Sequence, residues 1–227
     1  MAASLALLRQ ADAALRVGSA RPGGLGPPVE LSLRSRLGLI LIFGLFYGAV
    51  MGAYGARPLQ MLYSGLKVPL LLAVASLLSL PTFFVLNTLF GLRKDFPRVV
   101  GALFSAQAGL TVILASLAPI TAFVYVSGVS YQPAILFNAL TFGAASVGAQ
   151  AILRREYRDL IAGNPAHRLM LRAWLVTYVF VGIQMGWVLR PFIGDPIQPV
   201  QFFREDSWTN AYVAVAEIIL GALSGAR

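Results

Sequence analysis

The side chain with the greatest chemical potential in this sequence is Glu217, near the middle of the apolar segment 208–226. A charged group at the centre of a bilayer costs at least about 2.5 kcal/mol on insertion scales, so an intramembrane carboxylate indicates a site with partners. Small and polar residues share its helix face, at spacings of three and four: Asn210, Ala214, Gly221 and Ser224. This stripe predicts that Glu217 faces other helices rather than lipid.

Polar side chains in the other apolar segments could reach Glu217 in such a bundle. They are Gln184, Gln107, Asn138, Asn87 and Gln150. One interpretation is a proton- or cation-responsive site, with Gln107 and Gln184 nearest to its depth. The other is a protonated, hydrogen-bonded glutamate that only supports the structure, because a carboxylate without a basic partner in the membrane makes a poor relay. The sequence leaves both open.

Motifs for catalysis or cofactor binding are absent from the sequence. It contains no GxxxxGK[ST], no Gly-rich dinucleotide fingerprint, no HExxH and no GxSxG. The sequence also has no paired aspartates and no cysteine. His167, the only histidine, has no neighbouring set of metal ligands. We therefore expect no catalytic residue, no cofactor and no metal site, and we expect His167 to face solvent or lipid headgroups.

The composition is that of a membrane protein. Of the 227 residues, 58% are hydrophobic and 12% are charged, and the mean hydropathy is +0.75. A bilayer core of about 30 Å requires about 20 apolar residues per helix. Six segments meet this requirement: 37–56, 68–92, 99–127, 134–153, 169–189 and 208–226. The predicted fold is an all-α polytopic bundle of six transmembrane helices, with proline bends at Pro81 and Pro119.

The first 36 residues differ from the rest and form a separate predicted unit, residues 1–36, ahead of the transmembrane domain 37–227. Leu5, Leu8 and Leu15 share one helical face, which predicts a short amphipathic helix in the membrane interface. A frayed tail is the alternative. The stretch from Arg21 to Pro28 is rich in proline and glycine and predicts a linker. No cleaved signal peptide is indicated.

The basic residues indicate the orientation of the bundle. With six spans, the amino-terminal segment, the second and fourth connections and the carboxyl terminus share one side, and fourteen of the eighteen lysines and arginines lie there when Arg172, at that end of the fifth span, is included. The other side holds Arg57, Lys67, Arg190 and Arg204. The positive-inside rule then places both termini in the cytoplasm. The charge of +9 is thus a topology signal with some attraction to anionic lipids, and nucleic acid is not an expected partner.

Glycines four residues apart predict close helix contacts, because they let two backbones approach. Gly44, Gly48 and Gly52 form such a series in the first span, Gly182 and Gly186 form one in the fifth, and Gly221 begins another in the sixth. Contacts within the chain and contacts with another subunit are both compatible with this spacing.

The connection 190–209 is the only long one on the non-cytoplasmic side, and it combines prolines, aromatic rings and charges of both signs. Its prolines predict a stiff, extended backbone, and its rings suit the headgroup region. The residues that could contact a partner or lipid are Trp187, Arg190, Phe192, Asp195, Phe202, Phe203, Arg204 and Trp208. A lid over the bundle and a recognition surface are equally compatible with this pattern.

The stretches "LASLAPITAFVYVSG", "LFNALTFGAASVGAQ" and "FVGIQMGWVLRPFIGDPIQPVQFFRED" resemble a group of uncharacterised bacterial polytopic inner-membrane proteins. The group shares a proline-bent span and a "WVLRPFIG.P" junction, and the resemblance covers residues 99 to about 212. It implies a multi-pass protein of the bacterial inner membrane and no particular activity. A more distant similarity, to Yip1-like proteins of membrane trafficking, is limited to the number of spans and their polar flanks.

Two functions are compatible with these features. The first, which the sparse intramembrane charge favours, is a non-catalytic membrane subunit or scaffold that packs against other helices and presents the 190–209 loop to a partner or lipid. The second is a small transporter or channel with its path beside Glu217. Coupled transporters commonly use several charged groups or broken helices at the midplane. The expected partners are membrane lipids and either other membrane-protein subunits or further copies of this chain.

Overall fold

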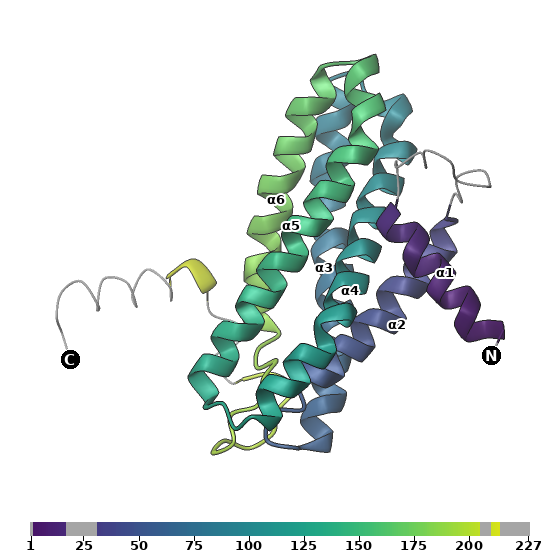
Figure 1. Cartoon of the computed structure of the whole chain (residues 1–227). Coiled ribbons are helices and arrows are strands. Elements are labelled where there is room, and N and C mark those ends of the chain that lie inside the picture. The colour runs from purple at the N-terminus through teal and green to yellow at the C-terminus, as the bar shows by residue number, and fades with distance from the viewer. Residues whose placement is uncertain (1, 17–30, 205–209, 214–227) are drawn as a thin grey trace.

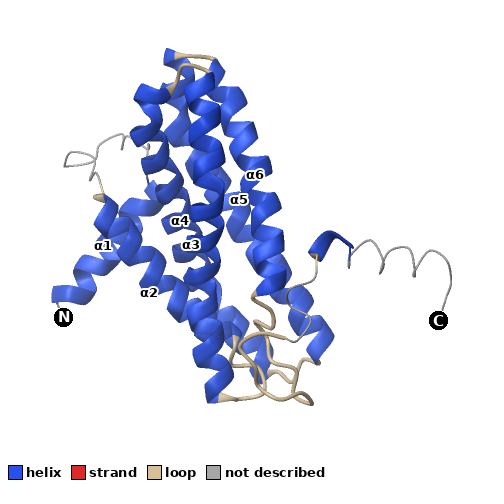
Figure 2. Ribbon diagram, turned by 180° about the vertical axis from the view of Figure 1, so that it is seen from behind, coloured by secondary structure: helices blue, strands red, loops and turns tan. Residues whose placement is uncertain are grey.

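The computed structural model of the protein describes residues 2–16, 31–204 and 210–213, and this part of the chain is helical without strands (Figures 1 and 2). A short helix precedes five long ones. Their bounds are α1 Ala2–Arg16, α2 Leu33–Met51, α3 Pro58–Leu89, α4 Phe96–Val126, α5 Tyr131–Gly163 and α6 Ala166–Val188, with a 3₁₀ turn, η1, at Arg93–Asp95. The prediction of an all-α fold is confirmed.

Five of the described helices, α2 to α6, are long and apolar enough to cross a membrane, as expected of a multi-pass membrane protein. They correspond to the first five predicted spans. Of the sixth predicted span, 208–226, only residues 210–213 are described, and both Glu217 and Gly221 lie outside the described residues. The linker 21–28 lies outside them as well.

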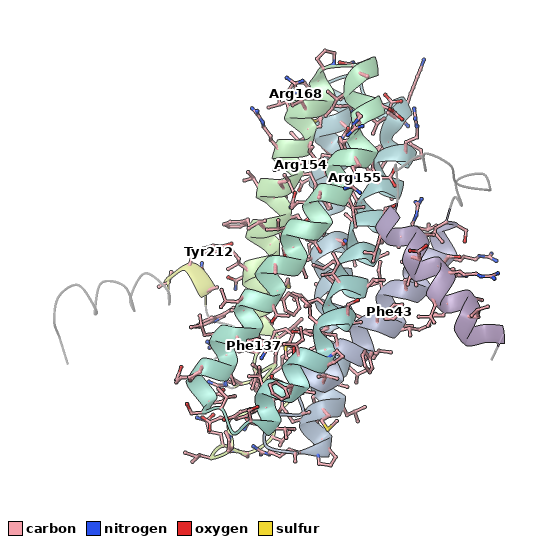
Figure 3. All side chains as sticks on the ribbon, in the orientation of Figure 1. Phe43, Phe137, Arg154, Arg155, Arg168 and Tyr212 are labelled. Carbon is pink, nitrogen blue, oxygen red and sulfur yellow. The ribbon has the colours of Figure 1, made fainter. Side chains whose placement is uncertain are left out.

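The helices alternate in direction and so define two ends of the bundle (Figure 1). One end, the basic end, carries the α3–α4 and α5–α6 connections, with the charged residues Arg93, Lys94, Arg154, Arg155 and Arg168 (Figure 3). The other end, the capped end, carries the α2–α3 and α4–α5 connections and the segment 189–204.

Helix α4 lies in the middle of the packing, against α2 on one side and α5 on the other, while α3 packs along α2 and α6. Two hydrophobic cores fill the bundle. One contains Tyr47 and Leu114, and the other, toward the basic end, contains Phe83 and Trp174. Helices α5 and α6 are consecutive in the chain yet contact each other little, as do α3 and α4.

Helix α1 packs obliquely against α4 and α2 (Figure 1). Its buried residues are Ala11 and Ala14, whereas Leu5 and Leu8, which the sequence placed on its apolar face, are exposed. Small side chains let the helix lie close to the bundle, and the two exposed leucines remain available for lipid. The helix therefore has two apolar surfaces: Ala11 and Ala14 face the bundle, and Leu5 and Leu8 face away from it.

Helix α3 begins ten residues before the predicted span, at Pro58, a residue type that favours the first turn of a helix. Lys67, expected in the connection before that span, lies instead inside the helix and is fully buried. Pro81 and Pro119 lie within α3 and α4, and both helices continue past them. The polar residues at the start of α3 lower its hydropathy, so the apolar run alone did not predict this part of the helix. Their hydrogen-bond partners are backbone groups of a distant segment.

Candidate functional site: a capped end and a membrane-facing pocket

Three polar side chains on α3 hold the segment that closes the capped end. Gln60, Ser64 and Lys67 are spaced four and three residues apart, which places them on one helix face. The Gln60 amide donates to the Phe192 carbonyl oxygen at 3.2 Å, and the Ser64 hydroxyl donates to the same oxygen. These three side chains are fully buried, so their donors are satisfied by the segment and not by water, whereas the Gln60 side-chain oxygen has no hydrogen-bond partner.

Lys67 is the charged member of this face. Its ammonium nitrogen donates to the Pro191 carbonyl oxygen at 2.7 Å and lies 4.9 Å from the centre of the Phe202 ring. A carbonyl dipole and an aromatic face both stabilise a cation, which is how a charge can be kept inside this end of the bundle. Lys67 therefore connects α3 to the covering segment.

Further contacts attach the same segment to its surroundings. The Arg57 guanidinium donates to the carbonyl oxygens of Asp195 at 2.7 Å and Gln198 at 2.8 Å. The Tyr131 hydroxyl donates to the Ile193 carbonyl oxygen at 3.3 Å. Residues 190–204, which we call the cap, are therefore fixed to α3, to the start of α5 and to the residue before α3.

The aromatic residues of the cap divide into an inner and an outer set. Phe192 packs against the core, and the Phe202 ring meets Tyr63 with 5.2 Å between ring centres. The Arg190 guanidinium lies 3.3 Å from the centre of the Trp187 ring. The outer set is Phe203, and the aliphatic side chain of Ile197, 94% exposed, also lies on the outer surface of the cap.

Polar members of the cap are also used locally. The Asp195 carboxylate accepts a hydrogen bond from the backbone N–H of Ile197, and Arg204 is half-buried. Trp208 lies outside the described residues. The cap is thus a lid on its inner side, and only its outer side is left for lipid or a partner.

Apart from Gln107 and Gln150, which line one pocket, the predicted intramembrane polar residues lie in separate surroundings in the described part of the chain. Gln107 donates to the Ser76 hydroxyl, and Asn87 donates to the Phe83 carbonyl oxygen of its own helix. Gln184 accepts from the backbone N–H of Ala211 at 3.0 Å. Each of these amides, and Asn138 as well, has separate partners, so the described residues form no single polar site among them.

Asn138 is the centre of a buried hydrogen-bond network between helices. Its amide oxygen accepts from the Tyr47 hydroxyl at 3.2 Å, and its amide nitrogen donates to the Tyr125 hydroxyl at 2.7 Å. Tyr125 in turn donates to the Met51 carbonyl oxygen at 3.1 Å. The network joins α2, α4 and α5 through hydrogen bonds between neutral groups, as expected of a contact that stabilises the packing of the helices.

Replacing this asparagine with another uncharged residue should therefore destabilise the bundle. In Asn138→Leu the buried Tyr47 hydroxyl loses its acceptor, which costs about 1–3 kcal/mol. We expect a lower thermal midpoint in detergent, measured by size-exclusion of heated samples, and partial recovery when Tyr47→Phe removes the stranded hydroxyl. An unchanged midpoint in the single variant would show that the network carries no stability.

The glycine series have different surroundings in the structure. A Cβ atom on Gly48 would lie 2.3 Å from the Ser64 carbonyl oxygen, and one on Gly52 would lie 2.7 Å from the Gln60 carbonyl oxygen. Gly44 is in ordinary contact with Pro69. The first series is therefore the contact between α2 and α3, within one chain. Gly182 and Gly186, by contrast, have no atom within 4 Å of such a Cβ position.

His167 is buried and not solvated, so the expectation that it faces solvent or headgroups is wrong. Its Nε2 atom lies 3.0 Å from a carboxylate oxygen of Asp95, and its ring meets Tyr157 edge to face. The pair joins η1 to the start of α6, and thus ties together the two connections of the basic end. Among the described residues, no three acidic or histidine side chains are grouped as a metal would require.

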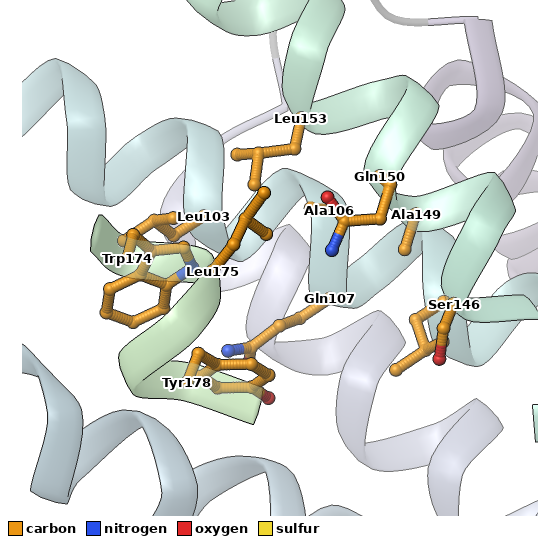
Figure 4. Close-up of a pocket in the computed structure, with 11 residues that line it drawn as sticks. Leu103, Ala106, Gln107, Ser146, Ala149, Gln150, Leu153, Trp174, Leu175 and Tyr178 are labelled. Atoms are coloured by element: carbon orange, nitrogen blue, oxygen red, sulfur yellow. The ribbon is translucent and has the colours of Figure 1, made fainter. Parts of the chain in front are cut away.

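A small pocket of about 80 Å³ lies between α4, α5 and α6 (Figure 4). Its walls are mostly apolar, with Trp174 and Tyr178 from α6 and leucines from all three helices. Gln107 and Gln150 bring amide groups to it, and the side-chain oxygen of Gln150 is buried without a hydrogen-bond partner. This is the feature that sequence reasoning missed, although Gln150 was among the polar residues singled out.

Comparison with protein-family models, with curated proteins and with solved structures found no match for this chain.

Proposed function

We propose that this protein is a non-catalytic subunit or scaffold of a membrane complex, with α6 as the helix that meets another membrane helix. On this proposal it lies in the bacterial inner membrane, with the basic end and both termini in the cytoplasm. The single observation that carries the proposal is the exposure of α6. Only 17% of the most apolar stretch of α6 is buried inside the chain, compared with 44% of the corresponding stretch of the span that contains α4.

The outer face of α6 is broad and apolar. Val176, Phe180 and Ile183 are spaced four and three residues apart and all are exposed, Val176 at 72%. The chain already places protein on this face, because the Tyr212 ring stacks on Phe180 with 4.7 Å between ring centres. The Tyr212 hydroxyl also donates to the Phe180 carbonyl oxygen. A face that accepts ring stacking and backbone contacts suits a polypeptide neighbour.

The interior of the bundle supports a structural role. Among the described residues, Lys67 is the only fully buried lysine, arginine, aspartate or glutamate, and its ammonium is bonded to the cap. The polar residues that a transport path would share have separate partners, and the pocket is small. These features support a packed framework better than a conduit.

A photo-crosslinking amino acid at Val176 tests the proposal in the native membrane. We expect a covalent adduct with another membrane polypeptide, identified by mass spectrometry. The matched control is Val147, an equally exposed position on α5 that should give lipid adducts alone. Lipid adducts at both positions would contradict the proposal. A crosslink from Val176 to this chain's own residues 214–227 would assign the face to the predicted sixth span and would also contradict it.

Glu217→Gln separates the proposal from the transporter alternative. A scaffold should assemble and act normally with this change, because the neutral amide keeps the size and hydrogen-bonding capacity of the carboxyl group. A proton-coupled path beside Glu217 should lose its pH dependence. The measurement is solute flux in reconstituted vesicles, together with recovery of the assembled complex.

A further inference from the structure

The pocket lies in the space between α5 and α6, which we call the groove. These helices are joined at the basic end, yet they contact each other little, because α5 packs along α4 and α6 along α3. On the α5 side the groove is lined by Ser146 and Gln150, and on the α6 side by Leu175 and Tyr178. Figure 4 shows these side chains around the pocket.

Two glycines lie on the groove-facing sides of α5 and α6, closer to the capped end than the pocket residues. Gly143 precedes Ser146 and Gln150 by three and seven residues, so it shares their face of α5. Gly182 follows Leu175 and Tyr178 by seven and four residues, on the corresponding face of α6. A Cβ atom at either glycine would meet no other atom within 4 Å. The groove is therefore open beside these two glycines, and we call this part of it the slot.

Arginines flank the groove at the basic end. Arg154 follows Gln150 by four residues on α5, and Arg172 and Arg168 precede Leu175 by three and seven residues on α6. Figure 3 shows Arg154 and Arg168 on the same side of the bundle, near its basic end. All three are exposed, and none forms an ion pair with an acidic side chain of the described residues.

We propose that this groove binds an anionic phospholipid, with its phosphate between Arg154 and Arg172 and one acyl chain in the slot between α5 and α6. A planar guanidinium binds phosphate oxygens in pairs, and basic pockets between membrane helices recognise anionic headgroups. The apolar walls and the open glycines accommodate a hydrocarbon chain.

The position of Gln150 below Arg154 matches the position of the ester groups below the phosphate of a phospholipid. Gln150 lies one helical turn below Arg154, and Tyr178 is on the opposite wall of the groove. The Gln150 amide N–H can donate to the ester oxygens that connect the phosphate to the acyl chains. The proposal goes beyond the subunit role and does not depend on it, because the groove and the outer face of α6 are different surfaces.

Quenching of Trp174 fluorescence by brominated lipids tests the proposal. Trp174 lines the pocket, and Trp187→Phe and Trp208→Phe leave it as the single tryptophan of the three in the sequence. The protein is reconstituted in phosphatidylcholine vesicles that contain a small fraction of lipid with brominated acyl chains. At equal fractions, we expect brominated phosphatidylglycerol to quench Trp174 severalfold more strongly than brominated phosphatidylcholine.

Two sets of variants identify the cause of the preference. Arg154→Gln with Arg172→Gln should remove it, whereas Arg93→Gln with Lys94→Gln, at the same end but on the α3–α4 connection, should retain it. Gly182→Leu should reduce quenching by obstructing the slot while both arginines remain. Size-exclusion profiles establish that each variant is folded, and the exposed arginines can be replaced without touching the core.

Three outcomes would overturn the proposal. Equal quenching by the two brominated lipids would show that the arginines select no headgroup. A preference that survives Arg154→Gln with Arg172→Gln would place the anionic lipid elsewhere. Absence of quenching by either lipid would show that the groove is filled by something other than an acyl chain.

Discussion

Gly48→Leu is expected to prevent α2 from packing on α3 and so to abolish recovery of folded protein. A Cβ atom at this position would lie 2.3 Å from the Ser64 carbonyl oxygen and 2.9 Å from the Gly65 Cα atom, both in the backbone. Backbone atoms cannot rotate away, so the two helices must separate. Overpacking a core costs about 1–3 kcal/mol and occasionally more, and we expect the upper part of that range or beyond here. The measurement is the yield of monodisperse protein in size-exclusion after extraction in mild detergent.

Gly38→Leu is the matched control, because Gly38 is in the same helix and has no atom within 4 Å of its Cβ position. It should leave the yield unchanged. If both variants behave alike, the loss reflects helix composition rather than contact, and the assigned α2–α3 interface is wrong. Gly48→Ala is informative as well, since even a methyl group would meet the Ser64 carbonyl oxygen.

Lys67→Glu is expected to release the cap. A carboxylate at this buried position would face the Pro191 carbonyl oxygen and the negative face of the Phe202 ring, both of which repel an anion. A buried charge without a compensating partner costs about 3–5 kcal/mol, which corresponds to roughly a hundredfold or more in the population of the open cap. We expect the bundle itself to remain assembled, because its two cores do not include Lys67.

Thiol labelling reads out this opening directly. The sequence has no cysteine, and Ile193 in the cap is only 6% exposed, so Ile193→Cys should react with maleimide only when the cap lifts. Lys67→Glu should accelerate the reaction strongly. Lys94→Glu, which changes an exposed lysine at the basic end, should not. Equal labelling rates in the two variants would show that Lys67 does not hold the cap.

Long apolar runs were enough to predict the helical class and five spans, because a helix must satisfy its own backbone in lipid and so requires an apolar run of known length. The start of α3 was harder to find. Gln60, Ser64 and Lys67 lower its hydropathy, yet their spacing of four and three residues already indicated one helix face. Polar residues with helical periodicity next to an apolar run are therefore a signal that the helix extends beyond the run.

The surroundings of individual side chains could not be predicted in the same way. Gly48 and Gly182 occur in the same spacing motif, but one faces a backbone and the other faces open space. His167 is paired with Asp95, which is 72 residues away, and local sequence carries no trace of that pair. The described part of the 190–209 connection, residues 190–204, is likewise held by Gln60 and Lys67, which lie more than 120 residues earlier than Pro191.

The most direct test of the subunit role is the mass of the particle that contains this protein when it is extracted gently from its native membrane into nanodiscs. Native mass spectrometry should detect a stoichiometric second polypeptide, and replacing Val176 and Phe180 with glutamine should remove it while the chain stays folded. A particle that contains only this chain, as a monomer or a homo-oligomer, would contradict the proposed role and would direct attention to flux measurements around Glu217.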